Sequence, residues 1–116
     1  MNNRIQRVNS LIKNELSQII LREVDFPKDV LVTITQVEVS KDLNQAKVHI
    51  SVIPEEQVDR TFKILNRRIY DLQQKLNRRL KMRPIPRIKF LKEEKTSEAA
   101  RVEELLEKIK DEEKQG

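Results

Sequence analysis

The sequence predicts an α+β fold in which a three-stranded sheet carries helices on one face. Stretches with the apolar spacing of a helix alternate along the chain with stretches in which every second residue is apolar. The turns between them are built from Asn, Asp, Pro and Ser, because the only glycine is Gly116. A sheet this small needs a helical cover to be stable. The predicted order is therefore helix, strand, strand, helix, strand, and then a C-terminal helical segment.

The first helix is predicted over residues 3–22. Apolar residues recur there at spacings of three and four, from Ile5 through Ile12 to Ile19, while charged residues occupy the other faces. This is the pattern of an amphipathic helix that packs one side against a core. Pro27 prevents the helix from continuing, so a loop follows.

Two antiparallel strands are predicted over residues 30–39 and 46–52. Both stretches alternate apolar and polar residues, and the segment 40–44 between them consists mostly of small polar turn residues. The alternation changes phase near Thr35 and Gln36, which would either reverse the buried face or be absorbed by a β-bulge. We favour the bulge, because it keeps one face of the sheet apolar throughout.

A long helix and a third strand complete the predicted domain. Pro54 and two acidic residues precede an apolar stripe that runs from Val58 to Leu80 at spacings of three and four. Pro84 and Pro86 then end the helix, and residues 87–92 alternate as a strand does. The proline link itself is either a stiff basic spur or a stop that positions the strand, and we favour the stop.

Composition argues against an enzyme. The chain has no cysteine, and its sequence contains no metal-ligand spacing, phosphate-binding loop or nucleophile motif, so neither a cofactor nor a small-molecule substrate is expected. The single His49 lies out of phase with the apolar residues of its strand, as a surface residue would. No stretch is apolar enough to enter or cross a membrane. We expect a cytoplasmic protein.

Positive charge is concentrated in residues 62–92. This segment holds eleven Lys and Arg against the single acid Asp71, a formal charge of +10, whereas residues 1–61 carry −1 and residues 93–116 carry −4. The bases of the predicted helix fall opposite its apolar stripe, and acids that could pair with them at helical spacing are missing except for Asp71. A merely solvated face would gain from mixed charges, so the segment indicates a polyanionic partner.

RNA bound through its phosphates is the partner that the residue types favour. Base-stacking readers need several exposed aromatic side chains, and this chain has only three Phe and one Tyr. Tyr70 lies away from the apolar stripe, where it would either stack on a base or pack at the edge of the stripe. The predicted RNA-binding residues are Arg4, Arg7, Lys63, Arg67, Arg68, Lys75, Arg78, Arg79, Lys81, Arg83 and Arg87.

Four stretches together resemble the ribosome-binding factor A family of bacterial assembly factors for the small ribosomal subunit. They are Arg4-Ile5-x-Arg7-Val8; Thr33-Ile34-Thr35-x-Val37-Glu38-Val39-Ser40-Lys41-Asp42-Leu43 with Ala46-Lys47-Val48-His49-Ile50-Ser51-Val52; Arg78-Arg79-Leu80-Lys81-Met82-Arg83-x-x-Pro86-x-Ile88-x-Phe90; and Arg101-Val102-Glu103-Glu104-Leu105-Leu106. The resemblance implies a type II KH-like domain over residues 1–92, with a helix, two strands, a long or kinked helical pair and a closing strand. An acidic extension, helical or partly disordered, would follow over residues 93–116.

The resemblance also implies a function. A monomeric factor would bind rRNA in the free, immature small subunit without catalysis, late in maturation and rRNA processing. The competing hypothesis is a protein-interaction module, in which the apolar stripe from Val102 to Ile109 or the two-faced helix docks an acidic or helical partner.

One feature of the chain departs from the family pattern. Family members usually place Ala-x-Gly at the junction within the long helix, where this sequence has Arg68-Ile69-Tyr70. Without the glycine we expect a straighter helix, or a bend near Asn66.

Overall fold

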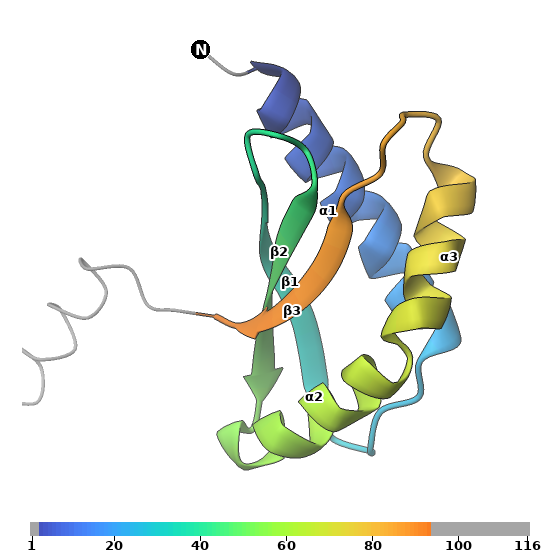
Figure 1. Ribbon diagram of the computed structural model, residues 1–116. Coiled ribbons are helices and arrows are strands. Elements are labelled where there is room, and N and C mark those ends of the chain that lie inside the picture. Colours follow the sequence, from blue (N-terminus) through green and yellow to red (C-terminus); the bar gives the residue numbers. More distant parts are fainter. Residues whose placement is uncertain (1–2, 94–116) are drawn as a thin grey trace, which may run out of the picture.

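A computed structural model describes residues 3–93 and contains three α-helices and three strands in that range (Figure 1). The expectations for the C-terminal extension beyond Glu93, including its helical stripe, lie outside the described residues. The elements in chain order are α1 (Asn3–Glu23), β1 (Leu31–Val39), β2 (Gln45–Ile53), a 3₁₀ turn (Glu55–Gln57), α2 (Val58–Arg67), α3 (Ile69–Arg79) and β3 (Arg87–Lys92). This order confirms the predicted α+β fold.

The sheet has the order β1-β2-β3, with β2 in the centre. β1 pairs with β2 antiparallel, as predicted, and β3 pairs with β2 in parallel. The register shifts between Ile34 and Gln36, so the phase change in the sequence is a β-bulge rather than a reversed face. Because the bulge absorbs one residue, Ile34 and Val37 both lie on the buried side of the strand.

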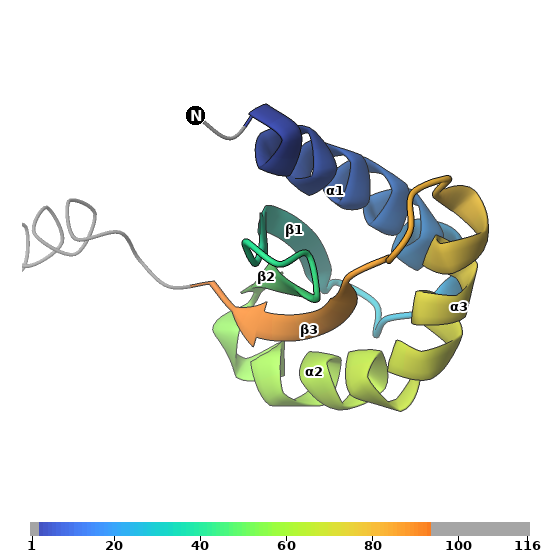
Figure 2. The same cartoon turned by 45° about the horizontal axis from the view of Figure 1, so that its top comes forward.

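All three helices cover the same face of the sheet. Every second residue of β2 from Ala46 to Val52 is buried, and Ile88 and Phe90 continue this apolar layer on β3. In Figure 2 α1 lies beside β1, α2 lies beside β3, and α3 lies between these two helices. The core is completed by five fully buried helical residues: Ile12, Leu16, Leu65, Leu72 and Leu76. Burying a side chain of this size stabilises the fold by roughly 1.5–3 kcal/mol.

The long helix predicted from Val58 to Leu80 is broken in two, which confirms the kinked helix that the resemblance implies. Of the two expectations for a chain without the glycine, the straighter helix is wrong, and the bend near Asn66 is close to the observed break. α2 ends at Arg67 and α3 begins at Ile69, and the chain turns between them (Figure 1). The turning residue is Arg68, with φ −102° and ψ 4°, two positions after Asn66. This conformation has a negative φ that side chains other than glycine can adopt. The break therefore needs no glycine.

Side-chain bonds hold the break in place. The guanidinium of Arg68 donates to the backbone carbonyl of Glu23, at the end of α1, and Nη2 of Arg68 donates to Oδ2 of Asp71 at 2.7 Å. These two contacts tie the start of α3 to α1 and to the next turn of α3. The kink is thus fixed by Arg68, which stands where the family pattern has alanine, and Tyr70 stands where that pattern has glycine.

The proline link between α3 and β3 positions the third strand, as predicted. Pro86 is buried, and its carbonyl accepts a hydrogen bond from Nε2 of Gln73 at 3.1 Å. Oε1 of the same Gln73 accepts the backbone N–H of Ile88 at 2.9 Å. The side-chain amide of Gln73 on α3 therefore fixes both the end of the link and the start of β3.

Candidate nucleic-acid interface

The predicted RNA-binding residues do not form one helical face. The break at Arg68 turns α3 away from α2, so bases that a straight helix would align are distributed over several surfaces (Figure 1). Three groups can be distinguished: a stripe on α2, a cluster between α1 and α3, and individual residues on α1, the proline link and β3.

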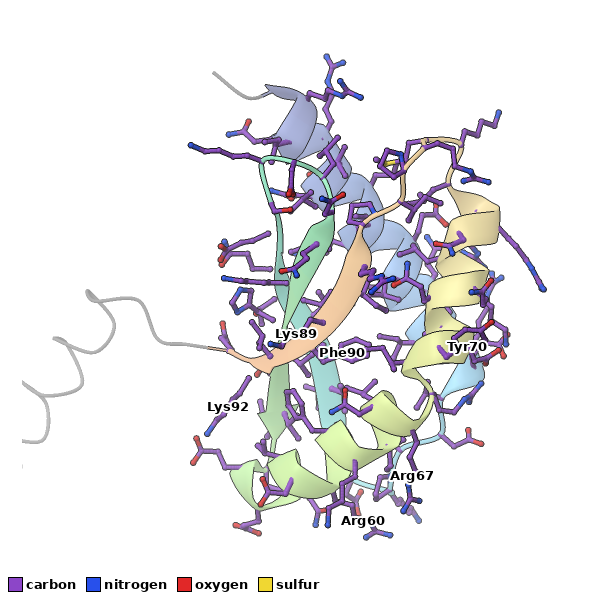
Figure 3. The ribbon with its side chains drawn as sticks, in the orientation of Figure 1. Arg60, Arg67, Tyr70, Lys89, Phe90 and Lys92 are labelled. Atoms are coloured by element: carbon purple, nitrogen blue, oxygen red, sulfur yellow. The ribbon has the colours of Figure 1, made fainter. Side chains whose placement is uncertain are left out.

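The α2 stripe is the most coherent group. Arg60, Lys63 and Arg67 follow one another at spacings of three and four, and all three are exposed. Figure 3 shows Arg60 and Arg67 pointing away from the sheet on the same side of α2. Within residues 3–93 no ion pair involves any of the three. Lys63 and Arg67 also line a shallow groove on this surface with Asp59.

Arg60 was not among the predicted site residues, although the sequence contained the signal for it. It lies two residues before the basic segment that begins at Phe62, so the count of Lys and Arg in residues 62–92 leaves it out. Its helical spacing to Lys63 and Arg67 places it on the same stripe.

Three of the predicted bases form ion pairs with acids of the protein itself. Nη1 of Arg79 lies 3.0 Å from Oε2 of Glu15, and Nζ of Lys75 lies 2.5 Å from Oε2 of Glu23. Lys75 also lies 3.3 Å from Oδ2 of Asp71, which Arg68 contacts from the other side. The expectation that Asp71 is the one acid available to these bases is wrong, because Glu23 of α1 also approaches Arg68 and Lys75, and Glu15 of α1 pairs with Arg79.

These contacts shift two pKa values in the directions expected for ion pairs. Hydrogen bonds from Arg68 and then Lys75 hold the pKa of Asp71 below its ordinary value of 3.8. The hydrogen bond to Glu23, more than that to Asp71, raises the pKa of Lys75 above its ordinary value of 10.5. Both side chains therefore stay charged near neutral pH and fasten α3 to α1.

A groove of about 220 Å³ lies beside this cluster, between α1 and α3. Arg22 and Arg78 line it from opposite helices, and both are exposed. Arg22 was not predicted, and no local pattern in the sequence could identify it. Arg22 reaches the groove only because the end of α1 packs against α3, and this packing is visible only in the folded chain.

The remaining predicted residues are exposed but lie apart. Arg4 and Arg7 lie in the first turns of α1, Lys81 and Arg83 lie in the link after α3, and Arg87 opens β3. The side chain of Arg87 lies on the face of the sheet that faces away from the helices, since its neighbour Ile88 is buried in the core.

Tyr70 is the one strongly exposed aromatic side chain of the chain. It is 76% exposed and points away from the body of the molecule on α3 (Figure 3), so it does not pack at the edge of the apolar stripe. Phe26 and Phe62 are half-buried, and Phe90 is in the core. Contacts by base stacking are therefore limited to one position.

Other kinds of site find no support in the part of the chain that the structure describes. Residues 3–93 contain no group of three or more His, Asp or Glu side chains placed to hold a metal ion. No helix in that range is long and apolar enough to cross a membrane. What the described surface offers is positive charge without an enclosed polar cavity.

The sequences of several known proteins align with this chain over most of its length. Ribosome-binding factor A of Thermodesulfovibrio yellowstonii is 37% identical over 107 residues, which cover 92% of this chain and 91% of the relative. The protein of the same name from Halothermothrix orenii is 38% identical over 111 residues, covering 95% and 91%. In Pseudomonas fluorescens Pf-5 the identity is 37% over 108 residues, covering 90% and 81%.

Solved structures agree with the sequence matches. The crystal structure of ribosome-binding factor A from Thermus thermophilus aligns with a TM-score of 0.64 and 27% identity, covering 76% of this chain and 93% of the other. Coordinates of the Thermus thermophilus factor fitted into the cryo-EM map of a 30S complex align with a TM-score of 0.59 and 31% identity, covering 72% and 88%. The family profile described as Ribosome-binding factor A matches residues 4–106. The chain belongs to the ribosome-binding factor A family.

Proposed function

We propose that this protein is a non-catalytic assembly factor that binds rRNA of the free, immature small ribosomal subunit during late maturation and rRNA processing. It acts in the cytoplasm, as a monomer with residues 1–92 as its RNA-binding domain. The observation that carries the proposal is the α2 stripe of Arg60, Lys63 and Arg67, three exposed bases that form no ion pair within residues 3–93. The related Thermus thermophilus factor fitted into a 30S complex supports the choice of partner.

The exposed bases outside the α2 stripe extend the contact. Arg78 and Arg22 line the groove between α1 and α3. The other exposed candidates lie at the start of α1, in the link after α3 and at the start of β3: Arg4, Arg7, Lys81, Arg83 and Arg87. Arg68, Lys75 and Arg79 contribute chiefly by holding α3 on α1, so that the positions of the other bases are fixed. With about six phosphate contacts, the logarithm of affinity should fall with the logarithm of salt concentration at a slope of roughly −4 to −5.

Such a factor needs no chemistry to assist assembly. By binding one conformation of the rRNA more tightly than another, it shifts the equilibrium by the difference between the two binding free energies. It must leave when the subunit matures, so moderate affinity at physiological salt fits its role better than very tight binding.

Reversing the charge of the α2 stripe tests the proposal. The variant Arg60→Glu, Lys63→Glu, Arg67→Glu should lose about 100-fold or more in affinity for immature small subunits, because three phosphate contacts become repulsive. Affinity is measured by co-sedimentation at low salt, and the melting temperature checks that the fold is intact.

A matched control changes the net charge equally at exposed lysines of α1 and of two turns, Lys13→Glu, Lys28→Glu, Lys41→Glu. We expect its loss to be at most about tenfold, since only the general field of the protein changes. Equal losses in the two variants, or unchanged binding by the α2 variant, would refute the assigned surface. A factor that binds an acidic protein but no RNA would favour the interaction-module alternative.

A further inference from the structure

We propose that the face of the sheet away from the helices is a second RNA phosphate contact, formed by Lys47, Lys89 and Arg87, so that the protein bridges two RNA segments. This inference rests on the proposed function and adds to it a separate contact surface. Of these three residues only Arg87 was expected at the interface from the sequence.

The strand register brings the three bases together. Lys47 of β2 and Lys89 of β3 are direct partners in the parallel pair, and Arg87 is paired with Gln45 two residues earlier on the same side. Neighbouring strands lie about 4.8 Å apart, so the two lysines leave the sheet side by side. All three are exposed, while the alternate residues Ala46, Val48, Ile88 and Phe90 are buried in the core.

The arrangement is unfavourable in the free protein. Like charges directly opposite each other across two strands destabilise a sheet. Glu38 of β1 lies opposite Lys47 and could relieve the repulsion, but its Oε1 lies 3.1 Å from Nε2 of His49 instead. Within residues 3–93 no ion pair involves Lys47, Lys89 or Arg87. A bound anion would remove this repulsion.

The composition of this face indicates phosphate rather than bases as the group bound. Phe90, the aromatic residue of β3, points into the core, so no Phe, Tyr or Trp side chain among the described strand residues faces outward to stack on a base. Lysine and arginine side chains on a flat surface suit the backbone of a folded RNA.

The open face and the α2 stripe cannot serve one straight RNA helix. The α2 stripe lies on the helical layer, which covers the opposite side of the sheet. In Figure 3 Lys89 lies on β3, whereas Arg60 and Arg67 lie at the lower edge of α2 and point away from the sheet. Two separate backbone contacts therefore imply two RNA segments, held at a distance set by the thickness of the domain.

The number of RNA molecules bound per protein tests the inference. Native mass spectrometry at low salt, with a short RNA hairpin in excess, should detect two hairpins on the full-length protein. The variant Lys47→Gln, Lys89→Gln should bind one hairpin, and its salt slope should decrease in magnitude by about 1.5. Its melting temperature should be unchanged or higher, because the repulsion between the lysines is gone. A purely structural role of the lysines predicts a lower melting temperature instead.

Two further variants complete the experiment. Arg60→Gln, Lys63→Gln, Arg67→Gln should also bind one hairpin, through the open face, and the control Lys28→Gln, Lys41→Gln should bind two. One hairpin on the unmodified protein, or two on the open-face variant, overturns the inference and leaves the proposed function standing if subunit binding persists. If the unmodified protein bound neither the hairpin nor the small subunit, the proposed function itself would be overturned.

Discussion

At the scale of single residues, polar side chains of the helices decide how the elements are joined. Gln73 lies between the apolar residues Leu72 and Leu76 of α3, and nothing in the sequence distinguishes it from a solvent-exposed helix residue. In the structure its amide bonds both Pro86 and Ile88, so it joins the helix to the strand that follows. Asp71 acts similarly within α3, where it is the shared acceptor of Arg68 and Lys75.

The lowered pKa of Asp71 predicts an acid-sensitive contribution to stability. A carboxylate whose pKa is lower in the folded than in the unfolded protein stabilises the fold fully above its unfolded value, here 3.8. The contribution disappears as pH falls through the folded value. Urea unfolding between about pH 5 and pH 2.5 should therefore show a steeper loss of stability for the unmodified protein than for Asp71→Asn.

Asp25→Asn is the control, because Asp25 is an exposed carboxylate for which the described chain shows no ion pair. It should leave the acid limb of the unfolding profile as steep as in the unmodified protein. Identical profiles for Asp71→Asn and the unmodified protein would show that the contacts of Asp71 are too weak to matter.

At the scale of elements, periodicity predicted α1 and the three strands, and it predicted one continuous helix where the structure has α2 and α3. The phase change at Thr35 correctly indicated a bulge, and the two prolines correctly ended α3. The break at Arg68 could not be found in this way, since the apolar stripe continues through it without interruption. Its cause is tertiary: the carbonyl that Arg68 binds belongs to Glu23, 45 residues away.

The pairing of the basic residues was missed for the same reason. Local spacing shows which acids lie one helical turn from Lys75 or Arg79, and only Asp71 qualifies. Glu23 and Glu15 are supplied by α1, from positions separated by 52 and 64 residues. A charge count along the sequence therefore locates the basic segment but not which of its members are free to bind a partner.

Replacing Arg68 separates the role of its side chain from that of its backbone. Arg68→Ala should lower the free energy of unfolding by about 1–2 kcal/mol, because the bonds to Glu23 and Asp71 are lost. Arg68→Gly should be less stable than Arg68→Ala by roughly 0.5–1 kcal/mol, since φ is negative here and glycine only adds freedom to the unfolded chain. Urea unfolding of both variants measures the difference. A glycine variant more stable than the alanine variant would mean that the kink does need glycine's freedom.

At the scale of the whole molecule, a one-sided sheet gives the protein two unlike surfaces. Helices on one face bury the apolar stripes and present bases at their outer edges. The other face carries mostly polar side chains, with the exposed pair Leu31 and Ile53 at one end, and no described element covers it. Within residues 3–93 the fold thus presents bases on two separate surfaces. The segment after Glu93 adds the opposite charge, with eight acids against five bases.

This distribution predicts that a chain ending at Glu93 folds and binds RNA more tightly. The core described above lies entirely within residues 3–93, and the backbone N–H of Glu93 already bonds Ile50 of β2. The melting temperature should therefore change little. Removing residues 94–116 raises the net charge from +5 to +8, so affinity for an RNA hairpin at low salt should rise several-fold, with a steeper salt dependence.

An extension of equal length in which every charged residue is replaced by Gln or Ser separates charge from chain length. If electrostatics dominates, this chimaera should bind RNA as the shortened chain does, and the gain should vanish at high salt because exposed charges are then screened. A melting temperature that falls markedly on truncation would show that residues 94–116 belong to the folded unit, and an unchanged or weaker affinity would show that their acids do not oppose RNA binding.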